Sequence, residues 1–192
     1  MFKKNEYKVL EKLFDDLSRS HTINQLSLAL GQKYMQTHRT IKELYEKNVI
    51  TLKKVGNNLL VGPDFSIYHP EYICVEIQRT LKADKSIIPI YKELCELDKD
   101  FVCILFGSYA NNTHTKNSDI DLLFIQDEPG FEREIRSMLS LYNVDVQVIN
   151  EKSLFEMWGK NELNVGNEIL KKHMVLFGYE QFLTLLRKKN GY

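Results

Sequence analysis

The sequence has few cysteines, and their number is odd: Cys74, Cys95 and Cys103 among 192 residues. None pairs with another at the two-residue spacing of zinc sites or redox motifs, which excludes those two classes of cysteine function. Each cysteine lies inside an apolar run, so we expect reduced and mostly buried thiols.

Long hydrophobic runs are also missing. The chain has no stretch of about 18 apolar residues that could cross a bilayer. Its charged, amphipathic start MFKKNEYKVLEKLFDDL contains no apolar core of a signal peptide. We therefore expect no membrane partner and a cytoplasmic location. With 43% hydrophobic residues, the chain has the composition of a globular, core-forming protein.

A net charge is absent as well, but the two signs are unevenly distributed along the chain. The whole sequence holds 26 Lys or Arg and 26 Asp or Glu. Residues 1–62 hold 11 basic against 6 acidic side chains, or +5, and the remainder holds 15 against 20, or −5. Because cationic surfaces attract polyanions and clustered carboxylates attract divalent metals, this split predicts two modules with different tasks.

The first third of the chain predicts three helices followed by a hairpin. The helical patterns cover residues 5–18, 23–30 and 33–47, and the strands cover 49–55 and 59–62 around the turn Gly56-Asn57-Asn58. A capping box formed by Thr22 and Gln25 would begin the second helix, and Gly31 would end it. In the third helix, Met35 is expected on the apolar side with Ile41.

This pattern resembles the winged helix-turn-helix family, over residues 1–65. In that family the third helix enters the major groove and the wing follows the phosphates. The resemblance implies contacts with duplex DNA from Lys33, Tyr34, Thr37, His38, Arg39, Lys53 and Lys54. The alternative interpretation is a protein-docking or dimerisation module, which leaves a homodimer open.

Residues 66–85 predict a helical linker between the two modules. One helical pattern covers residues 72–81 and a second covers 86–97. With Ser86 as its N-cap, the second pattern would have Pro89 in its first turn, where proline costs no hydrogen bond.

Three apolar runs in the second half predict strands that bring carboxylates together. The runs are residues 101–106, 118–125 and 144–149. The first is continuously apolar, typical of a strand buried on both faces, and Gly107 breaks it. In the other two, alternation sends Asp119 and Asp121 to one face and lets Asp145 join them. Because adjacent carboxylates repel each other, the pattern favours a divalent metal as counter-charge.

These residues form a recognisable motif: Gly107-Ser108-Tyr109-Ala110, seven further residues, and then Ser118-Asp119-Ile120-Asp121. The motif resembles the signature of minimal nucleotidyltransferases of the DNA polymerase beta superfamily, and Asp145 takes the third acidic position. The resemblance spans about residues 86–186. It implies an α+β fold overall, with a transferase domain over residues 86–192 built on a mixed sheet flanked by helices.

The resemblance also implies a role for each residue of the motif. Two Mg²⁺ ions would be held by Asp119, Asp121 and Asp145, which are the catalytic residues, and Asp145 would assist deprotonation of the nucleophile. The nucleotide would be bound by Gly107, Ser108, Lys116 and Ser118.

The chain departs from the family at Asn111-Asn112, where members often have Arg-Gly. The phosphate-facing cation is missing, although Lys116 could supply the charge, and asparagine tolerates a left-handed backbone. His114 in the same loop could touch the nucleotide, but a loop histidine of this kind is usually only solvated, which is our expectation here.

The function implied by the resemblance is transfer of a nucleoside monophosphate, AMP from ATP, to a hydroxyl group. Small domains of this family are often paired with a helical HEPN-type toxin, so the favoured acceptor is a partner protein. The alternative is a DNA-binding transcriptional regulator whose transferase domain senses nucleotide or docks a partner without turnover.

Overall fold

The computed structural model describes residues 2–192 and divides the chain into two compact units. One unit extends to Glu76 and also includes Leu186–Tyr192, whereas the other is the continuous stretch Ile77–Leu185. Met1, the first residue of the predicted front module, lies outside the described residues. The domain boundaries expected after residues 65 and 85 stay predictions.

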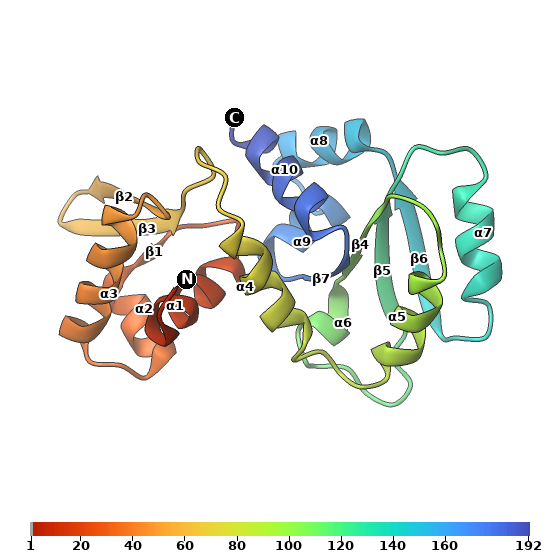
Figure 1. Ribbon diagram of the computed structural model, residues 1–192, viewed down its shortest axis with the longest axis horizontal. Coiled ribbons are helices and arrows are strands. Elements are labelled where there is room, and N and C mark those ends of the chain that lie inside the picture. Colours follow the sequence, from red (N-terminus) through yellow and green to blue (C-terminus); the bar gives the residue numbers. More distant parts are fainter. Residues whose placement is uncertain (1) are drawn as a thin grey trace. The chain divides into compact units, whose positions relative to one another are not determined.

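The first unit contains helices and a small antiparallel sheet (Figure 1). In chain order its elements include α1 (Lys4–Phe14), β1 (His21–Thr22), α2 (Ile23–Leu30), α3 (Tyr34–Glu46), β2 (Ile50–Val55) and β3 (Asn58–Pro63). The strand order is β1-β3-β2, and both pairs are antiparallel. The helices and the β2–β3 hairpin follow the order that the sequence patterns predict, whereas β1 was not predicted.

Local signals set the ends of α2. The hydroxyl of Thr22 accepts the N–H of Gln25 at 3.2 Å, and the Gln25 side chain accepts the N–H of Thr22 at 2.8 Å. This is the predicted capping box. The helix ends at Gly31, where φ is +60°, a backbone conformation that glycine adopts without strain.

The buried face of α3 differs from the prediction at two positions. Met35, expected on the apolar side, is 71% exposed, whereas Thr37 is fully buried. The buried positions are Thr37, Thr40, Ile41 and Leu44. They follow the helical repeat of three to four residues, and Met35 falls outside that series. Thr37 therefore has no surface with which to contact DNA, and its prediction as a DNA-binding residue is wrong.

The second unit is built on a four-stranded mixed sheet in the order β6-β5-β4-β7. The strands are β4 (Val102–Leu105), β5 (Ile120–Ile125), β6 (Val144–Ile149) and β7 (Met174–Phe177). Strand β5 is parallel to β6, whereas β4 is antiparallel to both β5 and β7. The three predicted strands are present, and the mixed character of the sheet is confirmed.

Helices lie on both faces of this sheet (Figure 1). They are α5 (Ile87–Cys95) and α7 (Phe131–Met138) on one face and α8 (Glu151–Gly159) and α9 (Val165–Lys171) on the other, with the short α6 (Gly107–Ala110) after β4. Helices α4 (Glu71–Thr80) and α10 (Tyr179–Lys189) each contain a boundary between the two units. Among the described residues, no helix combines the length and apolar character needed to span a membrane.

Side chains alternate between the two faces of the sheet along β5 and β6, so the buried apolar side chains and the carboxylates lie on opposite faces. Leu122, Phe124 and Val146 share a buried cluster with side chains of α5 and α7. Because successive side chains point to opposite faces, Asp121 and Asp145 lie on the other face of the sheet. Strand β4 is buried at every position, as predicted, since helices cover both of its faces.

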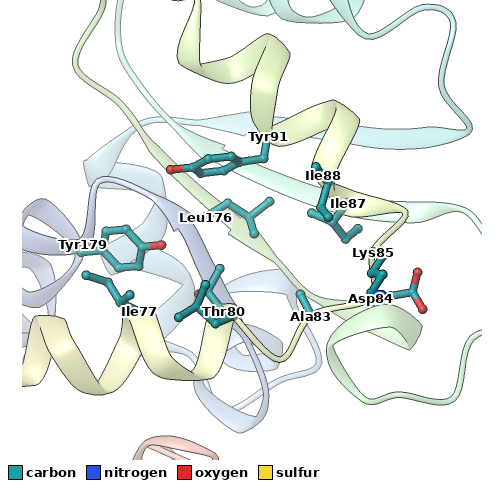
Figure 2. A pocket seen from close by; sticks show the side chains of 11 residues that line it. Ile77, Thr80, Ala83, Asp84, Lys85, Ile87, Ile88, Tyr91, Leu176 and Tyr179 are labelled. Carbon is teal, nitrogen blue, oxygen red and sulfur yellow. The ribbon is translucent and has the colours of Figure 1, made fainter.

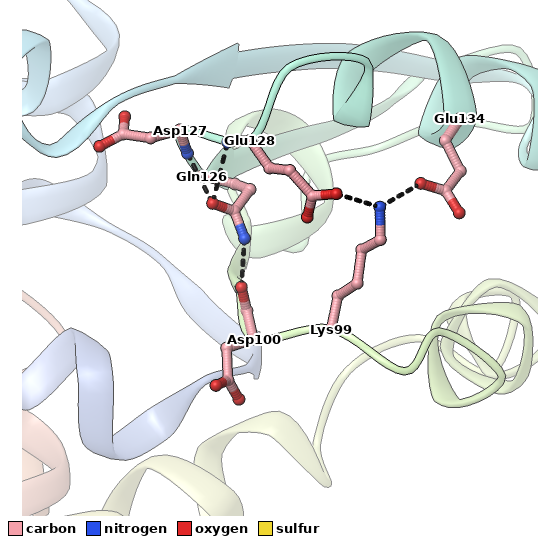
Figure 3. A network of polar contacts seen from close by, with 6 residues as sticks. All are labelled: Lys99, Asp100, Gln126, Asp127, Glu128 and Glu134. Atoms are coloured by element: carbon pink, nitrogen blue, oxygen red, sulfur yellow. Dashed lines mark hydrogen bonds and ion pairs between the residues drawn. The ribbon is translucent and has the colours of Figure 1, made fainter.

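A polar network joins the start of β4 to the end of β5 (Figure 3). Lys99 Nζ lies 2.9 Å from a Glu128 oxygen and 2.8 Å from a Glu134 oxygen. Beside it, the Gln126 amide donates to the carbonyl of Asp100. Because these groups lie at the surface, solvent and salt screen both ion pairs. The network secures the end of the β4–β5 pair opposite to the carboxylates.

The cysteines are only partly as expected. Cys103 on β4 is buried, but Cys74 on α4 and Cys95 on α5 are exposed. The prediction of mostly buried thiols is therefore wrong for two of the three. In a helix, neighbouring side chains point in different directions, so an apolar run in the sequence does not bury all its members.

Candidate active site

The candidate site begins where β4 ends in a glycine turn. Gly107 has a φ of +63°, in the left-handed region that favours glycine, and it begins α6. A Cβ atom at this position would lie 2.0 Å from Oδ2 of Asp121. Both the turn and the carboxylate that lies against it therefore require glycine.

Backbone hydrogen bonds hold Asp121 at this turn. Phe106 donates its N–H to the carbonyl of Asp121 at 3.1 Å, which extends the strand pairing to the turn. The N–H of Ser108 donates to the Asp121 carboxylate. Since these donors are the residues on either side of Gly107, the carboxylate of Asp121 faces the turn.

A second carboxylate lies on the neighbouring strand. Asp145 is the register partner of Asp121 in the parallel pair β5–β6. Paired positions of adjacent strands project their side chains to the same face. The side-chain amide of Gln147, on that face of β6, lies 3.5 Å from Oδ2 of Asp145. Asp119 directly precedes β5 and is exposed.

The ionisation of Asp121 reflects the charges around it. Burial raises the pKa of its carboxyl above the ordinary value, and the negative charge of Asp145 raises it further. The Ser108 N–H lowers this pKa by stabilising the charged form, and Asp119 adds a smaller increase. Asp145 and Asp119 therefore lie close enough to affect the ionisation of Asp121.

The chemistry of these groups suits a hard divalent cation, because carboxylate oxygens are the ligands that Mg²⁺ prefers. Among residues 2–192, however, no three His, Cys, Asp or Glu side chains are gathered closely enough to hold a metal ion as they stand. Asp121 and Asp145 are neighbours with Asp119 beside them, but they do not form a closed cluster.

The residues expected to bind the nucleotide lie in the turn and in the loop after α6. Ser108 is half-buried, and Lys116 is exposed. The Ser118 hydroxyl accepts the N–H of Thr115 at 2.9 Å. Ser118 thus closes a turn directly before Asp119, so its hydroxyl shapes the loop.

Comparison with known proteins agrees with this geometry. Residues 87–177 match the family described as "Nucleotidyltransferase domain". The match covers 91 of the 192 residues, and the Gly107 turn, Asp121 and Asp145 lie within it. A protein of Methanocaldococcus jannaschii named "Putative protein adenylyltransferase" is 33% identical over 88 residues. That match covers 46% of this chain and 64% of the relative, so the chain spans less than two thirds of the relative's length.

In the loop after α6, the chain departs from the motif of the nucleotidyltransferases that it resembles. Asn112 has a φ of +54°, in the left-handed region that asparagine tolerates better than most side chains. The side-chain amide of Asn111 donates to the carbonyl of Gly107 at 2.8 Å. An uncharged side chain therefore braces the glycine turn at the position where members often have arginine.

His114 of the same loop is not simply solvated, contrary to our expectation. Only 23% of its side chain is exposed, and its ring stacks on that of Tyr109 with centroids 4.0 Å apart and planes 7° apart. Its Nε2 lies 3.6 Å from Oδ2 of Asp84. Sequence reasoning missed both partners, and no local pattern connects Asp84 to this loop.

A separate pocket of about 450 Å³ lies in the same unit (Figure 2). Most of its lining is apolar and comes from α4, α5 and the connection between them, with Ile77, Leu81, Ile88 and Tyr91 among the side chains. Asp84 also borders the pocket, but its carboxylate points away from the apolar side chains (Figure 2). None of the candidate catalytic carboxylates lines this pocket.

In the first unit, six of the seven residues expected to contact DNA are exposed. They are Lys33, Tyr34, His38 and Arg39 at the start of α3, and Lys53 and Lys54 on β2. In the part of the chain that the structure describes, no ion pair engages Lys33, Arg39, Lys53 or Lys54. These positive charges are therefore available to a polyanion.

Proposed function

We propose that the nucleotidyltransferase domain is a metal-dependent enzyme that transfers AMP from ATP to a hydroxyl group. The observation that carries this proposal is the carboxylate of Asp121 against the Gly107 turn, with Asp145 beside it on the next strand. A glycine turn leaves room for phosphates, and adjacent carboxylates attract divalent cations.

Asp119, Asp121 and Asp145 would hold two Mg²⁺ ions. When bound, the metals would stabilise the negative charge that develops on the entering and leaving oxygens. Asp145 would accept the proton of the acceptor hydroxyl as its oxygen bonds to the α-phosphorus and pyrophosphate leaves. Gly107 and Ser108 would hold the triphosphate, and Lys116 in the following loop would supply a positive charge.

A protein hydroxyl is the acceptor that we favour. The name of the Methanocaldococcus jannaschii relative refers to adenylylation of proteins. The resemblance to minimal nucleotidyltransferases further favours a HEPN-type toxin as the partner that is modified.

The proposal is tested with ATP labelled at the α-phosphate, Mg²⁺ and candidate partner proteins. We expect label transfer by the wild-type protein and its loss in Asp121→Asn and Asp145→Asn. Asp127→Asn is a matched control, since Asp127 is an exposed aspartate just beyond β5. Transfer that persists in Asp121→Asn would exclude the site assignment.

The first unit supports a second proposed function, binding of duplex DNA by a winged helix-turn-helix. The supporting observation is the set of exposed cations on α3 and on the β2–β3 hairpin. In this arrangement α3 would enter the major groove and the hairpin would follow the phosphates. The protein would then be a transcriptional regulator whose transferase domain senses nucleotide or docks a partner.

Retardation of duplex DNA, measured over a range of salt concentrations, tests this second function. Binding through phosphates releases counterions, so the affinity should fall steeply as salt rises. Absence of binding to duplex DNA at every salt concentration would exclude this second function and leave the alternative interpretation, a docking or dimerisation module.

A further inference from the structure

His114 is a partly buried side chain in a mostly exposed loop. In the connection between α6 and β5, residues 111–119, His114 and Ser118 are partly buried and the other residues are exposed. The imidazole lies flat on the ring of Tyr109, with 4.0 Å between centroids and 7° between planes. Tyr109 is itself buried, with 8% of its surface exposed. The loop therefore has a fixed contact in its middle.

The second contact of the imidazole reaches a different segment. Its Nε2 lies 3.6 Å from Oδ2 of Asp84, in the connection between α4 and α5. Asp84 is held in turn by the backbone N–H of Ser86, which donates to its Oδ1 at 2.9 Å. His114 thus lies between α6 and a connection that is fixed at the start of α5.

The residues on either side of His114 are hydrogen-bonded to the Ser108 turn and form the turn before Asp119. On one side, Thr113 donates its N–H to the carbonyl of Ser108 at 3.0 Å. On the other side, Thr115 and Ser118 form the turn that precedes Asp119. A displacement of His114 would therefore also move the turn at Ser108 and the segment that precedes Asp119.

We propose that His114 is a positioning residue, clamped between Tyr109 and Asp84, that holds the loop so that Ser108 and Asp119 are placed for the nucleotide. This inference rests on the proposed nucleotidyltransferase function. The stacking energy of an aromatic pair corresponds to at most about a tenfold change in a binding constant. If this energy holds the loop in its binding conformation, losing the ring of His114 should change the nucleotide affinity by a measurable amount.

The test measures the affinity of the full chain for a non-transferable ATP analogue with Mg²⁺, in parallel with label transfer from ATP. We expect His114→Ala to weaken analogue binding about tenfold. His114→Phe keeps a ring on Tyr109 and should recover much of the affinity. Asp84→Ala, which removes the other half of the clamp, should fall between wild type and His114→Ala. Asn117→Ala is the control, since its exposed side chain lies in the same loop.

The thermal midpoint of each variant separates positioning from folding. A purely structural role would lower the midpoint of His114→Ala without changing the affinity of the folded protein, and this result would overturn the proposal. Equal affinities for the Ala and Phe variants would overturn it as well. If the wild type binds the analogue but transfers no label, the proposed enzyme function fails, whereas the affinity ratios still decide the role of His114.

Discussion

Gly107 allows the backbone to turn directly against the carboxylate of Asp121, because its φ is +63° and an added Cβ would lie 2.0 Å from Oδ2. Gly107→Ala meets a steric clash in addition to the left-handed backbone, which alone costs about 1–2 kcal/mol. We expect a decrease of at least that size in the free energy of unfolding in urea, together with loss of label transfer.

Gly31→Ala is the matched control for this substitution. Gly31 has nearly the same φ, +60°, but a Cβ there would meet nothing within 4 Å. The free energy of unfolding of Gly31→Ala should therefore decrease only by the cost of placing alanine in the left-handed backbone region. If both variants lost the same stability and Gly107→Ala still transferred label, the contact with Asp121 would have no importance.

The raised pKa of Asp121 predicts a conflict between activity and stability. The folded protein holds the Asp121 proton more tightly than the unfolded chain, chiefly because of burial and Asp145. The contribution of Asp121 to the unfolding free energy, measured as the difference between the wild type and Asp121→Asn, should therefore decrease as pH rises from the model-compound value of 3.8 through the raised pKa. At neutral pH, the charged carboxylate destabilises the fold, and lowering the pH below both values removes that cost.

Asp121→Asn should accordingly raise the thermal midpoint at pH 7 in buffer without divalent cations, while it abolishes transfer. Added Mg²⁺ should raise the midpoint of the wild type and have a smaller effect on the variant. Calorimetry of both proteins, with and without Mg²⁺, checks this. A variant that melts below the wild type under metal-free conditions would contradict it.

At the scale of elements, α3 and the β2–β3 hairpin carry separate parts of the proposed DNA surface. Arg39 lies on the helix and Lys53 on the hairpin. If both contact phosphates, the double variant Arg39→Ala, Lys53→Ala should reduce the slope of log affinity against log salt by about 1.8. Lys12→Ala is a suitable control, since Lys12 already pairs with Asp15 at 3.0 Å. An unchanged slope would exclude these two contacts.

The elements that the sequence predicted well are those with local signals. The capping box at Thr22 and the alternation around Asp121 each involve residues a few positions apart, so their pattern is visible in one window. The same reasoning failed for Met35 and Thr37. Hydrophobicity alone predicted that Met35 is buried, whereas in the structure Met35 is exposed and Thr37 is buried. The contact between His114 and Asp84 joins distant segments, and only the folded chain brings these together.

At the scale of the whole molecule, each proposed function draws on residues of one unit only. Asp121→Asn should therefore leave the affinity for duplex DNA within about twofold of the wild type, and Arg39→Ala should leave the rate of label transfer within the same range, because independent sites do not couple. Both measurements are made on the full chain. A larger effect in either direction would show that nucleotide and DNA binding are linked.

The path of the chain gives the molecule the topology of an inserted domain. Ile77–Leu185 is a single continuous piece, whereas the other unit is completed by Leu186–Tyr192, in which Arg187 donates to the carbonyl of Ser66 at 3.3 Å. Both passages of the chain between the units run through a helix, α4 at Glu76–Ile77 and α10 at Leu185–Leu186. A protein truncated at residue 76 would therefore lack Leu186–Tyr192, including the Arg187 contact with Ser66, and we expect it to be less stable than the same unit in the full chain.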